Sequence, residues 1–244
     1  MKRAFRALFM ALGMFSAIPC PYRPWDEDAR GMMLVCLPVL GAIIGGIWAL
    51  LAMLARHLLP MPLAAAVIVA LPWLLTGFMH LDGYMDTCDA ILSWRPLERR
   101  LEILKDSHLG AFGAVSLGLL MLVSYGAAQS LVQSDLRVLV LIPVISRCDS
   151  SFCVTTLKPL GHSEYAKVDG TPAQRLAILA IYLIALIIGG FWLGRGIIAL
   201  WAVTLAYALA MRWAAGTLGG VSGDLAGFAL SLSECAGLVA LALI

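Results

Sequence analysis

The chain has 244 residues, of which 61% are hydrophobic and 13% are charged, and its formal net charge is +2. Soluble proteins average about 45–50% apolar and about 25% charged residues. With a mean hydropathy of +0.92, this composition predicts an all-α, polytopic membrane helix bundle that forms one domain over residues 1–244. A soluble domain of useful size is excluded. No basic cluster is interleaved with aromatic residues, so we expect a lipid bilayer as partner and no nucleic acid.

The first 30 residues are expected to form an interfacial segment. Three basic residues within the first six positions precede an apolar run over residues 7–18, which mimics a secretory signal peptide. The sequence that follows, Pro19-Cys20-Pro21, is a poor cleavage site. We therefore predict an amphipathic helix that lies in the cytoplasmic interface of the membrane.

Behind this segment, apolar stretches approach the length that crosses a bilayer, which is about 20 residues. They lie near residues 32–55, 61–79, 109–132, 136–157, 176–194, 196–214 and 224–244. We therefore expect about seven transmembrane helices in addition to the interfacial helix.

Lysine and arginine indicate the orientation, because cytoplasmic loops carry an excess of them. If the N-terminus is cytoplasmic, the outer side receives only Arg56, Arg137 and Arg195. Thirteen fall on the cytoplasmic side, namely Lys2, Arg3, Arg6, Arg23, Arg30, Arg95, Arg99, Arg100, Lys105, Lys158, Lys167, Arg175 and Arg212. The same threading places five acids on that side, namely Asp82, Asp86, Asp89, Asp106 and Asp224. We therefore predict a functional site that faces the cytoplasm.

Directly behind the apolar run 61–79 stands the sequence His80-Leu81-Asp82-Gly83-Tyr84-Met85-Asp86-Thr87-Cys88-Asp89. A carboxylate costs about 2.5–3.5 kcal/mol at the centre of a bilayer, so three acids at the end of a span indicate function. On a helix, Asp82, Asp86 and Asp89 fall within about 60° of arc and about 10 Å of axis. Carboxylates this close repel one another unless a cation lies between them. Their oxygens suit Mg²⁺ or Mn²⁺, which predicts a divalent-metal site.

Neighbouring residues are candidates for binding substrate. Gly83 has no side chain, so a phosphate could approach its backbone. His80 is expected either to bind metal or phosphate or to act as an interfacial hydrogen-bonding residue. Ahead of the third span, Ser107 is expected to cap a helix whose free N–H groups face an anion. Asp106 is either a further metal ligand or a simple N-terminal cap.

Arg147 lies inside the fourth span, where a charge is costly. Its guanidinium matches phosphate oxygens. Asp149 is two residues away and therefore points to nearly the opposite face of a helix. A phosphate or a carboxylate from another span remains as partner, and we predict the phosphate. Glu234, in the seventh span, is either a buried acid that orients a ligand or part of a polar contact between helices.

The mouth of the seventh span carries the sequence Thr217-Leu218-Gly219-Gly220-Val221-Ser222-Gly223-Asp224. A loop of small residues up to Gly223 can wrap a phosphate and present Asp224 as a metal ligand. An ordinary glycine-rich turn that ends in a helix cap is the alternative. Because the threading puts this loop on the cytoplasmic side, we expect Asp224 to join the site of Asp82 and Asp86.

These motifs, in this order, resemble those of the cobalamin synthases, also called adenosylcobinamide-GDP ribazoletransferases. The resemblance runs from about Phe15 to the C-terminus and is carried by residues 37–41, 80–89, 101–113, 145–147 and 219–224 together with Glu234. The chain differs from the family pattern at Ser16-Ala17 and in the loop 158–165, so we assign no substrate contact there.

The resemblance implies a multi-pass enzyme of the bacterial cytoplasmic (inner) membrane that acts in the last steps of vitamin B12 assembly. Such an enzyme joins adenosylcobinamide-GDP to α-ribazole, or its 5′-phosphate, and releases GMP with the help of Mg²⁺. By resemblance, the residues that handle metal and phosphate are Asp82, Asp86, Asp89, Asp106 and Asp224. One carboxylate is expected to take the ribazole hydroxyl proton. Whether the enzyme forms an oligomer is left open.

Three other classes share parts of this pattern. A CDP-alcohol phosphotransferase would need Ala-Arg where Asp86-Thr87 stand. A prenyltransferase would suit the spacing of Asp82 and Asp86, but it requires a second acid-rich motif. A transporter with an acidic ion pathway predicts acids at the midplane of the membrane, whereas these acids cluster on one side. An assay for metal-dependent release of GMP from the GDP-activated corrinoid distinguishes all three classes from a ribazoletransferase, which we favour.

Overall fold

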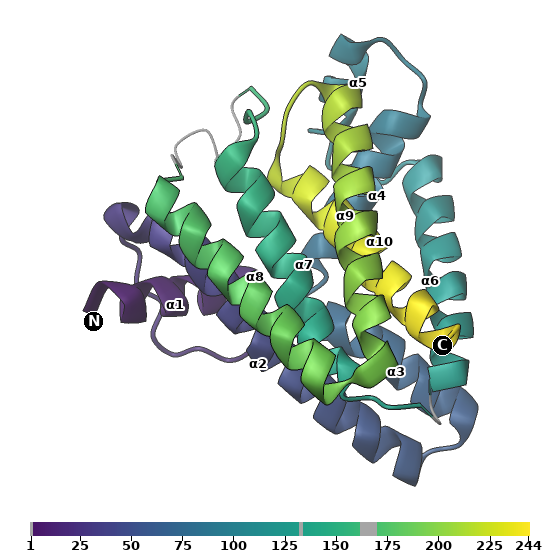
Figure 1. The fold of residues 1–244 in the computed structure, drawn as a ribbon. Coiled ribbons are helices and arrows are strands. Elements are labelled where there is room, and N and C mark those ends of the chain that lie inside the picture. Colours follow the sequence, from purple (N-terminus) through teal and green to yellow (C-terminus); the bar gives the residue numbers. More distant parts are fainter. Residues whose placement is uncertain (1, 132–133, 162–169) are drawn as a thin grey trace.

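The fold is described from a computed structural model that covers residues 2–131, 134–161 and 170–244. In these residues the chain forms α-helices joined by short loops and no strand, which confirms the predicted all-α class (Figure 1). The helices are α1 (Lys2–Phe15), α2 (Arg30–Leu58), α3 (Met61–Leu75), α4 (Met79–Leu92), α5 (Leu97–Ile103), α6 (Ala111–Leu131), α7 (Val138–Thr156), α8 (Pro172–Trp192), α9 (Ile197–Leu218) and α10 (Gly223–Ala242). Short 3-10 turns precede α2 at Glu27–Ala29 and α9 at Gly194–Gly196.

Among the described residues, six helices are long and apolar enough to cross a membrane: α2, α6, α7, α8, α9 and α10. The predicted span at 61–79 forms part of a bent pair, because α3 ends at Leu75 and the chain then bends by 91° into α4. Gly77 and Phe78 both have φ of 62° at the break, in the left-handed region that ends a helix. The described residues therefore hold six candidate spans, or seven if the bent pair counts as one, which agrees with the expected number of about seven.

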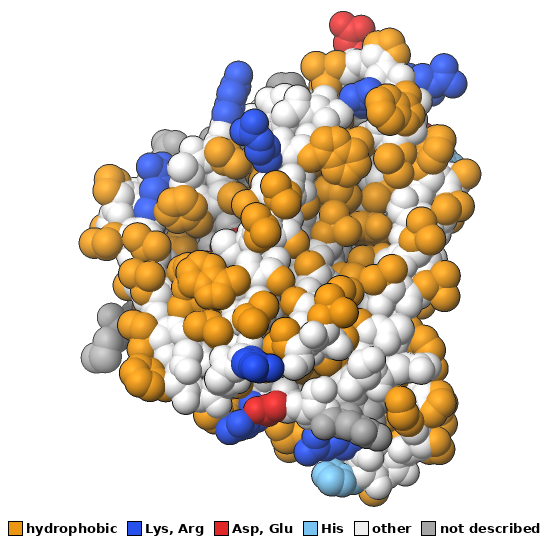
Figure 2. Space-filling view, turned by 45° about the vertical axis from the view of Figure 1, so that its right-hand side comes forward, with side chains coloured by type: hydrophobic (Ala, Val, Ile, Leu, Met, Phe, Trp, Pro, Cys, Tyr) orange, Lys and Arg blue, Asp and Glu red, His pale blue; other side chains and the backbone are white. Residues whose placement is uncertain are grey.

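The two ends of the bundle differ in what they carry. The starts of α2, α6, α8 and α10 meet the ends of α7 and α9 at the end that holds α4 and α5, which we call the α4 end (Figure 1). There the Leu160 N–H donates to the Val221 carbonyl at 2.8 Å. At the opposite end, Arg56 donates to the Ser134 carbonyl at 3.2 Å. Figure 2 shows a broad hydrophobic belt with Lys and Arg side chains above and below it.

The N-terminal helix α1 is amphipathic, as predicted. It buries Ala7, Met10 and Ala11 and exposes Phe5 and Met14. The arginines of its first two turns are exposed as well. The helix packs against α2, so its apolar side is covered by protein and its polar side remains available for an interface.

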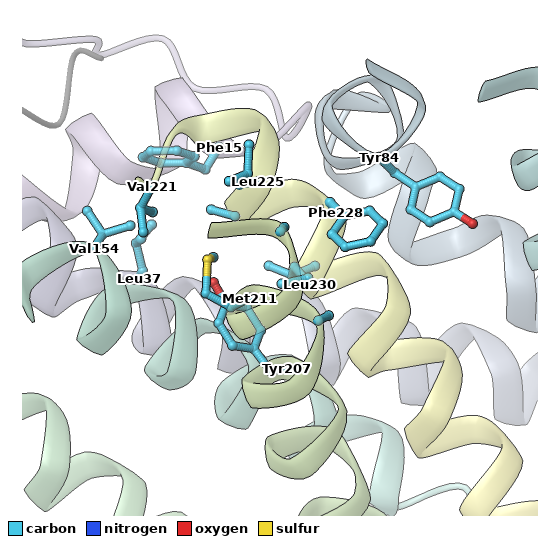
Figure 3. Close-up of a cluster of buried hydrophobic side chains, with 14 of the residues drawn as sticks. Phe15, Leu37, Tyr84, Val154, Tyr207, Met211, Val221, Leu225, Phe228 and Leu230 are labelled. Carbon is cyan, nitrogen blue, oxygen red and sulfur yellow. The ribbon is translucent and has the colours of Figure 1, made fainter. Parts of the chain in front are cut away.

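Small residues allow the close helix contacts that build the α4 end. A Cβ on Gly41 of α2 would lie 2.4 Å from the Pro143 carbonyl oxygen, so α2 and α7 touch through their backbones. The helices α4 and α10 are also in contact, and Tyr84 stacks on Phe228 with ring centroids 5.7 Å apart. Figure 3 shows these two rings beside the buried cluster formed by α1, α2, α7, α9 and α10. The core therefore holds α4 and α10, which carry acids, together with α7, which carries Arg147.

Candidate active site

A cavity of about 380 Å³ lies among α2, α4, α7 and α10 at the α4 end, and the last turn of α1 forms part of its wall. Its apolar lining includes Phe15, Leu34 and Leu37. Its polar lining comes from four helices and the loop before α10, namely Arg30, His80, Asp82, Arg147, Ser150, Ser222 and Asp224. The fold thus brings together side chains that are up to 194 positions apart in the chain, from Arg30 to Asp224.

Three carboxylates gather where α4 meets the start of α10. Asp86 lies one turn beyond Asp82, and its carboxylate experiences repulsion from Asp82, Asp224 and Asp89. Asp82 is exposed, whereas Asp86 and Asp224 are half-buried. Within residues 2–131, 134–161 and 170–244, neither Lys nor Arg forms an ion pair with Asp82, Asp86 or Asp224. Asp224 therefore joins Asp82 and Asp86, as its predicted position on the same side of the membrane required.

Gly83 faces protein and not an open phosphate site. A Cβ at this position would lie 2.7 Å from the Cα of Asp224 and 2.9 Å from its carbonyl oxygen. The prediction that a phosphate approaches the Gly83 backbone is therefore wrong. The missing side chain instead lets α4 contact α10, which places the carboxylates of the two helices beside each other.

The glycine-rich segment before α10 ends in a helix cap, which was the alternative interpretation. Ser222 has extended dihedral angles, and its Oγ accepts from the Leu225 N–H at 3.4 Å. The same Oγ donates to Oδ2 of Asp224 at 3.3 Å. Gly223 and Asp224 form the first turn of α10, where the helix dipole favours a negative charge. Both residues line the cavity.

Asp89 has a different role from the one its spacing suggested. Its Oδ2 accepts from the Gly110 N–H and its Oδ1 from the Gly113 N–H, both at 2.9 Å. The carboxylate therefore caps the N-terminus of α6, and it does not face the cavity. The predicted cap, Ser107, is wrong, because this residue lies exposed in the loop before α6. The N–H groups that we expected to bind an anion are already occupied by Asp89.

Asp106 lies outside the cavity, in the exposed loop between α5 and α6. Its Oδ1 accepts from the His108 N–H at 3.1 Å and lies 2.7 Å from Nδ1 of His108. These hydrogen bonds hold the pKa of the Asp106 carboxyl below its ordinary value. This position contradicts both expectations for Asp106. It is neither a metal ligand beside Asp82 nor the cap of the third span.

Arg147 is a member of a buried ion pair. Its Nη1 donates to Oε1 of Glu234 and to Oγ of Ser146, the latter at 3.0 Å. The side chains of Arg147 and Glu234 are 4% and 8% exposed. Our prediction that Arg147 has no structural ion-pair partner is wrong, and the other alternative, a carboxylate from another span, is correct. Glu234 makes the polar contact between α7 and α10, and it does not line the cavity.

The ion pair leaves part of the guanidinium available. Nη2 of Arg147 is buried and has no hydrogen-bond partner among the residues that the structure describes. Arg147 lines the cavity beside His80. The backbone of His80 is held by Ser231, whose Oγ donates to its carbonyl at 3.2 Å. An unsatisfied, buried donor at a cavity wall is costly unless a ligand completes it.

Arg30 lines the same cavity and was missed as a site residue. Its Nη1 pairs with Glu27 at 3.1 Å, and its guanidinium lies over the ring of Trp25. In the sequence, Arg30 was one of many basic residues on the predicted cytoplasmic side. Its position just ahead of the predicted span at residues 32–55 was the signal that could have identified it.

The carboxylates fit a hard cation in their chemistry but do not form a closed metal site. In the described part of the chain, no three His, Cys, Asp or Glu side chains are grouped closely enough to hold a metal ion. The predicted ligand set of Asp82, Asp86 and Asp89 is not assembled, since Asp89 points to α6. Asp82, Asp86 and Asp224 are oxygen donors that repel one another and have no Lys or Arg ion-pair partner in the described part of the chain. Such carboxylates are the donor set that Mg²⁺ or Mn²⁺ prefers.

One loop named in the sequence analysis lies partly outside the described residues. The loop 158–165, to which we assigned no substrate contact, lies outside the described residues from position 162 onwards, and so does Lys167.

Comparison with known proteins gives consistent matches over the whole chain. Residues 7–242 match the family described as cobalamin-5-phosphate synthase. An adenosylcobinamide-GDP ribazoletransferase of Clostridium perfringens (strain 13 / Type A) is 38% identical over the full length of both chains. One of Clostridium botulinum (strain Alaska E43 / Type E3) is 37% identical over 98% of this chain and 97% of its own. One of Roseiflexus sp. (strain RS-1) is 34% identical over 98% and 88%. No solved structure matches the chain.

Proposed function

The chain belongs to the cobalamin-5-phosphate synthase family, and from this membership we infer that it is an adenosylcobinamide-GDP ribazoletransferase, the name that its relatives carry. It joins adenosylcobinamide-GDP to α-ribazole, or to α-ribazole 5′-phosphate, and releases GMP. The observation that supports a location for the active site is a single cavity. Asp82, Asp224, His80 and Arg147 all line it.

The reaction is a displacement at phosphorus. A bond forms between the ribazole hydroxyl oxygen and the phosphate attached to cobinamide, and the bond from that phosphate to GMP breaks. Such a transfer depends on positioning and on neutralising charge more than on covalent help from the protein. Arg147 lines the cavity, and its buried Nη2 has no hydrogen-bond partner among the described residues, which supports a contact with a phosphate oxygen. Either Asp82, Asp86 or Asp224 takes the proton of the attacking hydroxyl.

We propose that Asp82, Asp86 and Asp224 hold Mg²⁺ or Mn²⁺, and that Asp89, which was expected to be a further ligand, does not take part. When bound, the ion supplies positive charge to the pyrophosphate oxygens. The three carboxylates have no Lys or Arg partner among the described residues, so their negative charge is available to a cation. His80 and Gly223, which border the same cavity, are proposed to contact the substrate.

The apolar wall of the cavity suits the acceptor. Phe15, Leu34 and Leu37 offer an apolar surface beside the carboxylates, and the benzimidazole ring of α-ribazole is a flat, largely apolar bicycle. A volume of about 380 Å³ lies within the range of small-ligand sites, about 300–1,000 Å³. We propose that α-ribazole enters here with its hydroxyl towards Asp82.

We further propose that the protein lies in the bacterial cytoplasmic membrane with the α4 end in the cytoplasm. This proposal is supported by the excess of Lys and Arg on the segments that meet there. Soluble nucleotide substrates and GMP are then on the same side as the site.

The test is GMP release by the purified protein from adenosylcobinamide-GDP and α-ribazole, with Mg²⁺ or with a chelator. Chelation should abolish release, and added Mg²⁺ or Mn²⁺ should restore it. Asp82→Asn and Asp86→Asn should each lower turnover by about 100-fold or more, while the protein still purifies as a folded species. Glu98→Gln removes an exposed acid of α5 and serves as the matched control. Near-normal turnover of either Asp variant contradicts the metal assignment.

A further inference from the structure

A second cavity lies at the C-terminal end of α4, and the proposed function gives it no role. Its volume is about 770 Å³, and it is bounded by the end of α4, by α5 and by the start of α6. We call it the α5 pocket. The lining residues that matter for the argument are Asp89, Arg95, Arg99, Asp106, His108 and Phe112.

The groups of the α5 pocket that can bind an anion are side chains and not a helix terminus. The N–H groups of Gly110 and Gly113 at the start of α6 are bonded to Asp89. Arg99 pairs with Glu102. Arg95 is exposed and forms no ion pair with any described residue. The pocket therefore offers two guanidinium groups, one of them unengaged, and arginine forks match phosphate oxygens.

Two further features fit a guanine base. Asp106 uses only Oδ1 for His108, and its Oδ2 accepts no hydrogen bond from the residues that the structure describes. A free carboxylate oxygen can accept a hydrogen bond from the N1–H of guanine, whereas adenine has no N1–H. Phe112 is 50% exposed, and it lines the pocket with a free aromatic face on which a purine can stack.

The position of the α5 pocket relative to the first cavity fits a displacement at phosphorus. Asp82 lines the first cavity and Asp89 lines the α5 pocket. The two residues are seven positions apart on α4, which is about 10 Å along the helix, and Asp86 lies between them. In such a displacement, the entering and leaving oxygens lie on opposite sides of the phosphorus. A phosphate near Asp86 would have the first cavity on one side and the α5 pocket on the other.

We propose that the α5 pocket binds the guanosine monophosphate portion of the GDP-activated substrate and holds GMP as it leaves. Arg95 and Arg99 contact the phosphate, Asp106 contacts the guanine edge, and Phe112 stacks on the base. This assignment rests on the proposed function, because it takes its leaving group from that reaction.

The experiment measures GMP on the full-length protein in detergent, both by direct titration and as an inhibitor of turnover. Wild-type protein should bind GMP more tightly than AMP. Arg95→Gln should weaken GMP binding and inhibition at least tenfold, and Phe112→Ala should weaken both. Asp106→Asn should reduce the preference for GMP over AMP. Lys105→Gln removes a charge from the same exposed segment without touching the pocket, so it should behave as wild type.

The outcomes separate the pocket from the reaction. If wild-type protein releases GMP from adenosylcobinamide-GDP, but Arg95→Gln and Phe112→Ala bind GMP as tightly as Lys105→Gln does, the pocket assignment is overturned and the reaction stands. Wild-type protein that turns over but neither binds GMP nor is inhibited by it also overturns the pocket. If wild-type protein releases no GMP at all, the proposed function fails. All the substituted residues are exposed. Melting temperatures that match that of the wild-type protein confirm that the variants fold.

Discussion

At Asp89, both carboxylate oxygens accept hydrogen bonds from backbone N–H groups of the next membrane helix. A carboxylate is favourable at a helix N-terminus because it satisfies otherwise unpaired donors and complements the helix dipole. Since Asp89 belongs to α4, this cap ties the start of α6 to the helix that carries Asp82 and Asp86. Moving Asp89 to a metal would leave the N–H groups of Gly110 and Gly113 without partners.

Substitutions at Asp89 should therefore act on stability first. Asp89→Ala removes two hydrogen bonds to a charged acceptor and should lower the free energy of unfolding by about 2–4 kcal/mol. Asp89→Asn keeps one acceptor oxygen, so its free energy of unfolding should lie between those of the wild-type protein and Asp89→Ala. Turnover per folded molecule should survive Asp89→Asn but not Asp82→Asn. Thermal melting and GMP release on the same samples decide the matter: loss of turnover at an unchanged melting temperature would identify Asp89 as a ligand.

The pair of Arg147 and Glu234 combines a structural role with a proposed catalytic one. Removing one member of a buried pair leaves an uncompensated charge and costs about 3–5 kcal/mol. Arg147→Met and Glu234→Leu should each lower stability by this amount. The double variant has no unpaired charge, so it should recover most of the loss.

Activity should not recover with stability, because the double variant lacks the Nη2 donor at the cavity wall. The measurement is chemical unfolding together with turnover for the two single variants and the double variant. A double variant that is both stable and active would show that Arg147 has no contact with substrate.

The site could be predicted from the sequence as a set of residues but not as a set of contacts. His80, Asp82, Arg147 and Asp224 were named, and the fold brings all four to one cavity. Spacing along a helix shows which side chains share a face, but it does not show which neighbouring helix covers each turn. For that reason Asp89 was grouped with ligands although α6 covers it, and phosphate was predicted as the partner of Arg147 although Glu234 occupies that place.

At the level of elements, the bent pair of α3 and α4 departs most from expectation. Hydropathy over 61–79 predicts a span but does not show the bend, because it averages over the residues at which the chain turns. The turn needs left-handed conformations at Gly77 and Phe78, and Phe at such a position is uncommon. The bend of 91° brings α4 against the start of α10, where Asp82 and Asp86 lie near Asp224.

The contact between α4 and α10 makes Gly83 sensitive to a single added carbon. In Gly83→Ala the Cβ would lie 2.7 Å from the Cα of Asp224, which is backbone and cannot move alone. The helices must separate, which should cost about 1–3 kcal/mol and lower turnover further by moving Asp82 away from Asp224. Gly118→Ala on α6 has open space around its Cβ and is the control. Equal melting temperatures and activities in the two variants would contradict this account.

For the molecule as a whole, composition was sufficient to predict the class, and apolar length was sufficient to locate six spans to within a few residues. Both signals are sums over many residues, so single errors do not matter. The order in which helices pack is a different kind of information. It depends on particular close contacts, such as Gly41 against Pro143, which leave no periodic trace in the sequence.

The placement of charge at the two ends of the bundle predicts the orientation of the protein in the membrane. Lys105, between α5 and α6, lies at the α4 end, and Arg195, between α8 and α9, lies at the opposite end; both are exposed. Since Lys and Arg are retained on the cytoplasmic side, Lys105→Cys should react with a membrane-impermeant maleimide only after cells are opened. Arg195→Cys should react in spheroplasts that are intact. The six native cysteines, all free, are first replaced by serine or alanine, and turnover confirms that this background is folded. Labelling of Lys105→Cys in intact spheroplasts, with Arg195→Cys protected, would place the carboxylates on the outer side and contradict the proposed cytoplasmic site.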